Sequence, residues 1–510
     1  MTRIVRDPLR AADEDYDIVI VGGGIYGAML LLLAAAHDLK AILIERNDFG
    51  SGVSFNSLRI IHGGLRYLQS LDLRRSNAMI VERAWFLKNF PDLVVRLPCL
   101  MPLYNRGVRR KSTMRLALRL DNLLSRRTNQ SLEKDRQIPA GQLIPPSQVE
   151  ELFPMVDRIG LKAGAIWHDA FVPDSQRLLI EILRWSVSMG GQALNYVEAG
   201  KLLRNGTNVH GVIGHDRVTD EHFDLRSRVV INAAGPSSRS LAARYDRDIP
   251  ELFRPSLAWN VLFDRPRISD HAVAVSKADR SAHTYFLLPW KGKLLVGTGH
   301  ARVTNESDKF VTGEQLGRMI EDVNSAVTGL KLQIRDVERV FQGLLPVRDD
   351  GTIDLTSRET IRDHGRHGGP QGLFTVSGTK LVAAHRVAVK TMRAVCSRFF
   401  PNQLKPFGSL KSRPDPPKNW DISASRLCTA NALKHHEPYL RRIIDEESVI
   451  RLGDLAFRRT TLWEEPAALM KIAKELALLF NWHDSKQRKE IASLEADLYG
   501  TTMEKANAGD

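Results

Sequence analysis

The residues that most clearly indicate chemistry are Gly22, Gly24 and Gly27, which form a G-x-G-x-x-G pattern. They follow the apolar segment 16–21 (YDIVIV) and precede the apolar segment 28–36. In such a pattern Gly22 allows a tight turn, Gly24 lets the backbone approach a pyrophosphate, and Gly27 lets a helix pack closely on a strand. The pattern therefore predicts a site for the diphosphate of a dinucleotide at the N-terminus of a helix.

Glu45 supplies the carboxylate that this chemistry needs. It ends the apolar segment 41–45 (AILIE), about 20 residues beyond the glycines, where it can accept hydrogen bonds from the ribose hydroxyls of an adenosine. Strand, glycines, helix, strand and acid follow one another in the order of a βαβ unit. The pattern alone does not separate FAD from NAD, because both cofactors carry an ADP half.

A second segment with polar chemistry follows Glu45. Residues 51–57 (SGVSFNS) are small and rich in hydroxyls, so Ser54 and Ser57 are suited to lie along a pyrophosphate. They lead into residues 60–68 (IIHGGLRYL), which contain His62. A glycine-containing turn before a helix explains the same segment without any ligand.

Length and composition describe the chain that must position these residues. With typical domains of roughly 100 to 200 residues, 510 residues suffice for about two to four domains. The 43% hydrophobic and 26% charged content is that of a globular protein and excludes collagen-like or wholly disordered classes. The net charge of +14 permits anionic partners, namely nucleic acid, anionic lipid or a phosphorylated substrate, and does not choose among them.

The cysteines and the apolar segments bear on the compartment. The 3 cysteines include no C-x-x-C pair, so neither a disulfide framework nor a cysteine-rich zinc site is indicated, and no metal site is expected. The first residues lack the apolar core of a secretory signal, and the run 28–36 is too short to span a bilayer, so no transmembrane helix is predicted. We expect a cytoplasmic protein, with peripheral contact at the inner face of the cell membrane as a further expectation.

These motifs resemble those of the FAD-dependent glycerol-3-phosphate dehydrogenases, within the wider group of D-amino-acid-oxidase-like flavoproteins. The resemblance begins with residues 15–30 (DYDIVIVGGGIYGAML) and 61–68 (IHGGLRYL) and covers nearly the whole chain. Further segments match in the same order: 190–197, 229–236, 283–298, 376–381, 451–460 and 469–494.

The resemblance implies an α/β fold in three parts. We expect a Rossmann-like FAD-binding βαβ domain of the glutathione-reductase type, an antiparallel-sheet substrate domain and a C-terminal helical cap. The expected boundaries are 1–105, 160–250 and 340–400 for a discontinuous FAD domain, 106–159 for a basic helical insertion, 251–340 for the substrate sheet and 411–510 for the helical domain. A Pro-rich basic stretch, 411–418, marks the clearest boundary.

The resemblance also implies which residues hold FAD. They come from the glycine motif, the hydroxyl-rich segment, the strand on the adenine side, the second flavin-domain signature and the late return to the cofactor. The expected cofactor-binding residues are Gly22, Gly24, Ile25, Gly27, Glu45, Ser54, Ser57, His62, Gly63, Gly64, Leu65, Val197, Ala234, Gly235, Gly378, Lys380 and Leu381.

The implied reaction is oxidation of sn-glycerol 3-phosphate to dihydroxyacetone phosphate by hydride transfer to flavin, with a base taking the hydroxyl proton and electrons passing to a quinone. A bound phosphate needs cations, because a buried charge without a partner is costly. Arg66, Tyr67, Arg358 and Lys380 stand at positions that contact substrate in the family, and Lys380 is also a catalytic candidate. A homodimer is one expected assembly.

Three departures from the family bear on the substrate. Leu345 stands where the family has an arginine, and Arg348, three residues further on, is the candidate replacement cation. Asn260 stands where the family has a histidine; it can orient a hydroxyl but takes no proton at neutral pH. His300, in place of a family aspartate, is a candidate replacement base.

Residues 106–127 (RGVRRKSTMRLALRLDNLLSRR) predict a basic amphipathic helix, which suits either an anionic bilayer near a quinone pool or ordinary packing with solvated arginines.

Three alternatives to the glycerol-3-phosphate reaction stay open. In the first, the chain oxidises another alcohol or amine on the same scaffold. In the second, it holds FAD without catalysis. The third, nucleic-acid binding, rests on charge alone and is not expected without a matching motif.

Overall fold

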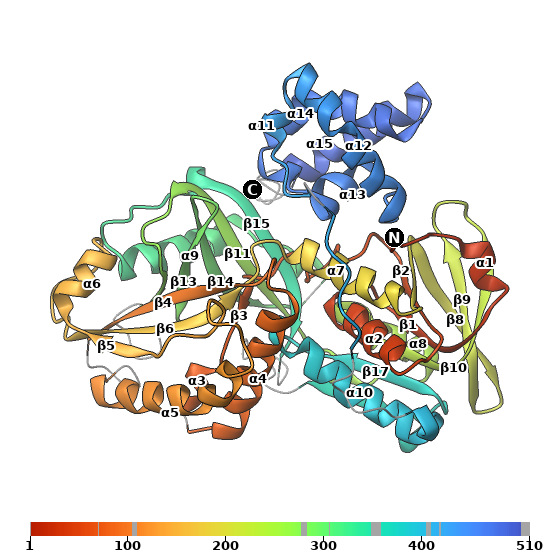
Figure 1. The fold of residues 1–510 in the computed structure, drawn as a ribbon, viewed down its shortest axis with the longest axis horizontal. Helices are drawn as coiled ribbons and strands as arrows, with labels where there is room; N and C mark the ends of the chain where they lie inside the picture. Colours follow the sequence, from red (N-terminus) through yellow and green to blue (C-terminus); the bar gives the residue numbers. More distant parts are fainter. Residues whose placement is uncertain are drawn as a thin grey trace.

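The computed structural model describes residues 2–69, 71–104, 110–276, 283–304, 306–347, 359–403, 410–417 and 420–500. Two sheets lie side by side, and a group of C-terminal helices stands over their junction (Figure 1). The strands are β1 (Asp15–Val21), β2 (Ala41–Glu45), β3 (Ile60–Ile61), β4 (Val95–Leu103), β5 (Gln142–Ile144), β6 (Ala163–Phe171), β7 (Gln192–Asn195), β8 (Val197–Asn205), β9 (Asn208–Asp216), β10 (His222–Asn232), β11 (Pro255–Pro266), β12 (Ala272–Val275), β13 (Tyr285–Trp290), β14 (Lys293–Arg302), β15 (Val337–Pro346), β16 (Thr360–Asp363) and β17 (Leu373–Ser377).

The helices connect these strands and cover their faces. The α-helices are α1 (Pro8–Ala12), α2 (Ile25–Ala36), α3 (Leu65–Gln69), α4 (Leu73–Asn89), α5 (Lys111–Asn129), α6 (Pro146–Leu152), α7 (Ser175–Ser188), α8 (Ser238–Tyr245), α9 (Gly313–Ala326), α10 (Ala384–Phe399), α11 (Ala424–Leu427), α12 (Ala430–Glu446), α13 (Leu452–Asp454), α14 (Pro466–Ala477) and α15 (Asp484–Tyr499).

The first sheet contains the predicted βαβ unit. Its central strand order is β16-β17-β10-β1-β2-β7, and β1 pairs in parallel with both β2 and β10. Because parallel strands present their carboxyl ends at one edge, the ends of β1, β2 and β10 meet there. Both the βαβ prediction and the wider prediction of an α/β fold with a C-terminal helical region are confirmed.

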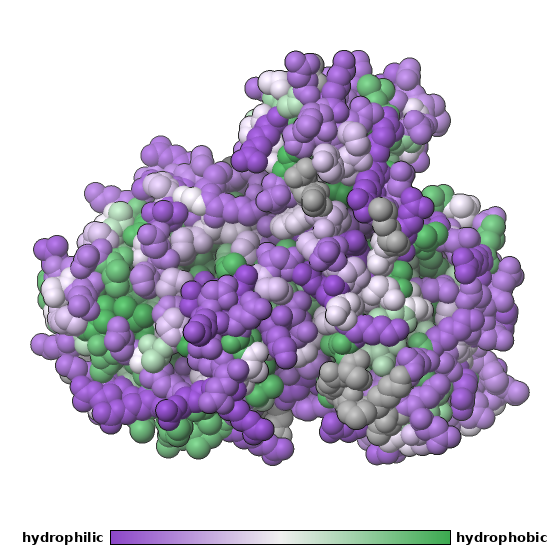
Figure 2. All heavy atoms as spheres, in the orientation of Figure 1, coloured by the Kyte–Doolittle hydropathy of each residue, from purple (hydrophilic) through white to green (hydrophobic). Residues whose placement is uncertain are grey.

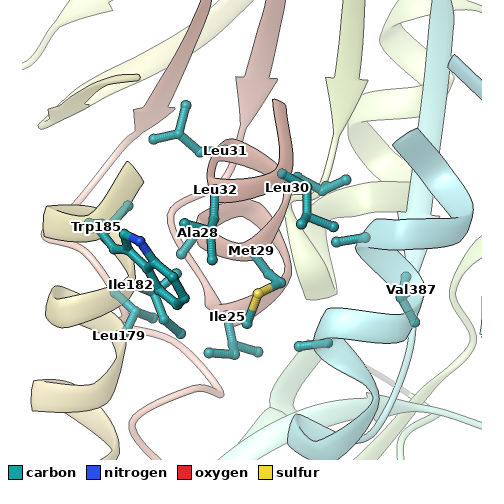
Figure 3. Close-up of a cluster of buried hydrophobic side chains, with 14 of the residues drawn as sticks. Ile25, Ala28, Met29, Leu30, Leu31, Leu32, Leu179, Ile182, Trp185 and Val387 are labelled. Atoms are coloured by element: carbon teal, nitrogen blue, oxygen red, sulfur yellow. The ribbon is translucent and has the colours of Figure 1, made fainter. Parts of the chain in front are cut away.

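Helix α2 is buried because it carries apolar residues on all sides. It packs on the first sheet between α7 and α10, so that Met29 and Leu32 belong to a cluster with Trp185 of α7 and Val387 of α10 (Figure 3). The other face of this sheet is covered by the antiparallel strands β8 and β9 together with α8. The glycine turn therefore joins two elements that the core holds rigidly.

The second sheet has the order β15-β11-β14-β13-β12-β4-β6-β3 and is mostly antiparallel. Helix α9 covers one face, where Trp259 of β11 donates a hydrogen bond from Nε1 to Sδ of Met319 at 3.1 Å. The opposite face packs on the C-terminal helices through an aromatic cluster that includes Phe341 and Trp463.

Strands β4 and β6 lie in the second sheet, although the expected boundaries place residues 1–105 and 160–250, which contain these two strands, in the FAD domain. Nine residue pairs join β4 to β6, from Val95–Phe171 to Leu103–Ala163. The two paired strands lie far apart in the chain, so a local sequence pattern does not reveal that they pair. Whether the sheets fold as separate domains stays a proposal.

The C-terminal helices are connected to the rest by a segment and by buried ion pairs. Residues 410–417 run along α7, where Trp185 donates from Nε1 to the carbonyl oxygen of Lys411 at 2.9 Å. Arg177 of α7 donates to both carboxylate oxygens of Glu447, at 2.9 and 2.7 Å. In the described part of the chain, no helix is long and apolar enough to cross a membrane.

Candidate active site

The glycine turn lies between the ends of β1 and α2. Gly22 has φ +114°, a conformation that favours glycine, and an added Cβ there would lie 2.6 Å from the carbonyl oxygen of Ala233. An added Cβ at Gly27 would lie 1.8 Å from the carbonyl oxygen of Gly22, so the helix packs directly on the turn. The backbone of this turn is thus bare enough for a diphosphate to approach the first amides of α2.

Glu45 occupies the predicted place beside the glycines. Its Oε2 accepts from the amide of Gly23 at 2.7 Å, and its Oε1 accepts from the amide of Asn47 at 2.9 Å. Burial raises the pKa of this carboxyl group, which the two amides partly oppose. A ribose bound here would meet a carboxylate with two oriented acceptor oxygens.

Two further predicted segments close the adenosine side. The amide of Tyr196 donates to the carbonyl oxygen of Asn47 at 3.0 Å, which places Val197 next to the end of β2. The amide of Ala234 donates to Oδ1 of Asn232 at 3.2 Å, at the end of β10, and Gly235 follows with φ +53°. Segments separated by up to about 200 residues therefore surround one turn, as an ADP site requires.

The hydroxyl-rich segment runs past the start of α2. Ser54 accepts at Oγ from the amide of Ile25 at 3.0 Å, so it lies at the helix N-terminus where a pyrophosphate would sit. Ser57 instead accepts at Oγ from the amide of Arg59 at 3.3 Å and shapes the chain before β3. Of these two serines, Ser54 is the one that the structure brings to the glycine turn.

His62 and Gly63 are fixed by a buried acid that the sequence analysis missed. Asp169 on β6 lies with Oδ2 at 3.1 Å from Nδ1 of His62, and its Oδ1 accepts from the amide of Gly63 at 2.6 Å. Burial would raise the pKa of Asp169, but His62, Arg83 and the Gly63 amide together lower it. No local motif marks Asp169, because its partners come from other elements.

Lys380 lies at the return to the cofactor segment. Its Nζ donates to the hydroxyl of Tyr67, and its carbonyl oxygen accepts from the hydroxyl of Tyr26 at 3.1 Å. An added Cβ at Gly378 would lie 2.5 Å from the Tyr26 hydroxyl, so this glycine and Tyr26, which the sequence analysis did not single out, determine the path of the loop. Leu381 follows in a short turn packed against β3.

Arg66 and Tyr67 come to the same place from α3, together with Leu65, whose side chain is buried. Burial, followed by the charges of Arg66 and Arg386, lowers the pKa of Lys380 to about 8. The Arg66 side chain is exposed, and among the described residues no hydrogen bond or ion pair holds it. Arg386, in contrast, is paired with Glu359.

Asn260 and His300, two of the three departures, have different environments on the second sheet. Asn260 is buried with its amide occupied: Nδ2 donates to the carbonyl oxygen of Asn56 at 3.0 Å, and Oδ1 accepts from Oγ1 of Thr298 at 3.0 Å. His300 is half-buried, and burial, followed by the charge of His283, lowers its pKa to about 4. Asn260 therefore holds the backbone carbonyl group of Asn56, and the ring of His300 stays neutral near pH 7.

The last of the predicted substrate-binding positions lie at or beyond the end of β15. Arg348 and Arg358 lie outside the described residues, whereas Leu345 lies on β15, half-buried and paired with Ser256 of β11. Within the described residues, no group of three or more histidine, cysteine, aspartate or glutamate side chains could hold a metal ion.

Comparison with known proteins agrees with this geometry. Residues 17–384 match the model of a family described as FAD dependent oxidoreductase, and the chain belongs to this family. FAD is accordingly its cofactor, and the glycine turn, Glu45 and Ser54 fit an ADP half.

Within that family the chain is similar to glycerol-3-phosphate dehydrogenases. It is 26% identical to the aerobic glycerol-3-phosphate dehydrogenase of Staphylococcus haemolyticus, over 96% of this chain and 83% of that protein. It is 28% identical to the glycerol-3-phosphate dehydrogenase of Synechocystis, over 73% of this chain and 68% of that protein. The crystal structure of the glycerol-3-phosphate dehydrogenase from Bacillus halodurans complexed with FAD shares the fold, with a TM-score of 0.72, 21% identity and coverage of 97% and 96% of the two chains.

Proposed function

We propose that this enzyme oxidises sn-glycerol 3-phosphate to dihydroxyacetone phosphate and passes the electrons to a quinone. Bound FAD supplies an acceptor for the hydride that leaves the alcohol carbon. The protein's residues must then hold a phosphate dianion, orient the hydroxyl and accept its proton. Similarity to glycerol-3-phosphate dehydrogenases over nearly the whole chain supports the proposal.

The observation that carries the proposal is the proximity of Arg66 and Lys380. Nζ of Lys380 donates to the hydroxyl of Tyr67, the residue next to Arg66 on α3, and the charge of Arg66 makes the charged form of Lys380 less favourable. Two cations that repel each other are stabilised when a dianion binds between them. We propose that Arg66, Tyr67 and Lys380 bind the phosphate group of the substrate, and that Arg348 and Arg358 contribute to the same phosphate site.

A membrane contact would bring this site near a quinone. Helix α5 buries Met114 and Leu118 and leaves Leu116 and Leu123 exposed, at 51% and 61% of their surface. The exposed side also carries Arg115, Arg119, Arg126 and Arg127. Figure 2 shows a hydrophobic patch bordered by hydrophilic residues at the lower left edge, where Figure 1 places α5. A cationic rim around exposed leucines suits the surface of an anionic bilayer.

Oxidation of an unphosphorylated alcohol or an amine is the second candidate. Leu345 favours it, because an apolar side chain stands where the family resemblance implies a phosphate-binding arginine. This alternative keeps the cofactor site unchanged and removes the need for a second cation beside Lys380.

Steady-state kinetics with a short-chain quinone distinguish the two. If Arg66 and Lys380 bind phosphate, kcat/KM for sn-glycerol 3-phosphate exceeds that for glycerol by roughly 100-fold or more, since charge-assisted bonds to phosphate are lost with glycerol. Glycine serves as the amine probe. Equal or faster oxidation of glycerol or glycine would overturn the proposal in favour of the second candidate.

A further inference from the structure

His283 lies just before β13 and has a fixed ring orientation. Its Nε2 is 2.7 Å from the carbonyl oxygen of Thr298. A carbonyl oxygen only accepts hydrogen bonds, so Nε2 carries the hydrogen and Nδ1 presents a lone pair when the ring is neutral. The side chain is exposed, and no hydrogen bond from the described residues occupies Nδ1.

A bulge between β11 and β14 aims Thr298 at this histidine. Asn260 pairs with Gly297 and Trp259 pairs with Gly299, so Thr298 is the extra residue on β14. Such a bulge redirects the groups on its strand. Oγ1 of Thr298 donates to Asn260 while its carbonyl oxygen accepts from His283, so one residue connects the two.

The connection continues toward the cofactor segment. Nδ2 of Asn260 donates to the carbonyl oxygen of Asn56, two residues beyond Ser54. The imidazole of His283 is therefore held, through Thr298 and Asn260, by the same loop that meets the N-terminus of α2. This gives Asn260 a positioning role without any proton transfer of its own.

The charged and aromatic groups around His283 come from four elements. Arg66 of α3 and Asp322 of α9 act on it electrostatically, with opposite signs. The rings of Tyr285 of β13 and His300 of β14 lie with centroids 4.9 and 5.5 Å away. Partial desolvation by the groups around the ring lowers the pKa of His283 and Arg66 lowers it further, while the bond to Thr298 and Asp322 oppose this, so the net shift favours the neutral ring.

The other candidate bases are less suited to receive a proton. Asn260 has no basic nitrogen and both ends of its amide are occupied. Lys380, with a pKa of about 8, is mostly protonated at pH 7, and its Nζ donates to Tyr67. Nδ1 of His300 is buried without a partner among the described residues, away from solvent.

We propose that His283 is the catalytic base of this enzyme, a step that rests on the proposed function. The hydroxyl proton of the substrate passes to Nδ1 of His283 as the hydride leaves the same carbon for the flavin. The O–H and C–H bonds of the substrate break and the C=O bond forms, and bound FAD would be the acceptor for the two electrons that leave with the hydride. The proton then leaves to solvent, because the ring is exposed and Arg66 disfavours its charged form.

The test compares His283→Gln and His283→Ala with the control His271→Gln, which alters a half-buried histidine before β12. Flavin content per chain establishes that each variant folds and binds FAD. Anaerobic flavin bleaching by sn-glycerol 3-phosphate is then followed from pH 5 to 9. We expect bleaching of the flavin in the His283 variants to slow by about 100-fold or more. The wild type should lose rate toward acid pH and the variants should not, and added imidazole should restore rate to His283→Ala.

A readout independent of turnover is modification by diethyl pyrocarbonate, located by peptide mass spectrometry. Dihydroxyacetone phosphate is expected to protect His283 and to leave exposed histidines such as His222 reactive. Variants within threefold of wild type at all pH values, or a His283 modified equally with and without the phosphate ester, would overturn the assignment. A wild-type flavin that sn-glycerol 3-phosphate fails to bleach would instead show that the proposed function itself is wrong.

Discussion

Asp48 and Arg459, 411 residues apart in the chain, form a fully buried ion pair in which Arg459 donates from Nη1 and Nη2 to the two carboxylate oxygens at 2.7 and 2.8 Å. Asp48 follows β2 and its acid Glu45, whereas Arg459 belongs to the C-terminal helices. The cofactor end of the first sheet and the C-terminal region are thus joined directly. Nδ2 of Asn195 also donates to Asp48 at 2.8 Å.

Removing this carboxylate should loosen the C-terminal region. Asp48→Ala leaves a buried guanidinium unpaired, which typically costs about 3–5 kcal/mol. We expect a lower melting temperature and faster proteolysis near residues 410–417. The control is Asp248→Ala, which removes the exposed partner of Arg239 and should change stability little. A melting temperature for Asp48→Ala equal to that of the control would contradict a structural role.

The same ion pair has a defined pH dependence. Burial alone would raise the pKa of Asp48, but the charge of Arg459 outweighs it and the pKa is lowered. Because the folded pKa lies below the unfolded one, this stabilisation is complete above the ordinary pKa near 3.9 and is lost as pH falls through the lower folded value. Acid unfolding of Asp48→Ala should therefore be less steep below pH 4 than that of the wild type.

The glycine turn predicts a specific loss of cofactor. At Gly24 an added Cβ would lie 3.3 Å from Oγ of Ser54, on the side where the diphosphate approaches, so Gly24→Val should purify with little or no FAD. Gly317→Val is the matched control, since nothing lies within 4 Å of an added Cβ there. The flavin absorbance per chain measures both. A Gly24→Val protein as yellow as the control would show that the cofactor is held elsewhere.

Arg66 should matter for the phosphate and not for the flavin. Arg66→Ala removes one charge-assisted contact, worth about 1.5–3 kcal/mol, so KM for sn-glycerol 3-phosphate should rise by roughly 10- to 150-fold. KM for glycerol and the FAD content should stay the same. The exposed Arg204 on β8 gives the control Arg204→Ala. An unchanged KM in Arg66→Ala would remove Arg66 from the phosphate site.

Loss of the Lys380 proton should make substrate binding depend on pH. Its pKa of about 8 means that the amine is charged below pH 8 and loses its proton above it. KM for the phosphate ester should therefore rise above pH 8, and Lys380→Arg should abolish this rise. In Arg66→Ala the rise should move to higher pH, because a charge that lowers the pKa is gone. A rise at the same pH in Arg66→Ala would show that the two cations do not interact.

Binding to membranes tests the surface of α5. The double variant Leu116→Glu and Leu123→Glu replaces two exposed leucines within a cationic rim. We expect the wild type to pellet with anionic liposomes at low salt and the variant to remain in solution. Leu9→Glu, on exposed α1, is the control. Equal pelleting of all three proteins would exclude α5 as the contact.

The cofactor-binding end of the first sheet was predictable because its residues lie close together in the sequence. Gly22, Gly27 and Glu45 belong to consecutive elements, and their spacing alone places them at one edge of a parallel sheet. Asp169 and the pairing of β4 with β6 were not predictable in this way, because each depends on partners in distant segments. The structure shows that the amide of Asn260 is hydrogen-bonded at both ends. His283 begins the matched segment 283–298, but only its contact with Thr298 singles it out.

The most direct measurement is the visible spectrum of the anaerobic enzyme during titration with sn-glycerol 3-phosphate, with dihydroxyacetone phosphate assayed in the same samples. We predict that the flavin band bleaches and that one molecule of dihydroxyacetone phosphate forms for each flavin reduced, while glycerol at the same concentrations leaves the band unchanged. A flavin that stays oxidised with the phosphate ester, or that glycerol bleaches equally well, would contradict a phosphate-binding site at Arg66 and Lys380.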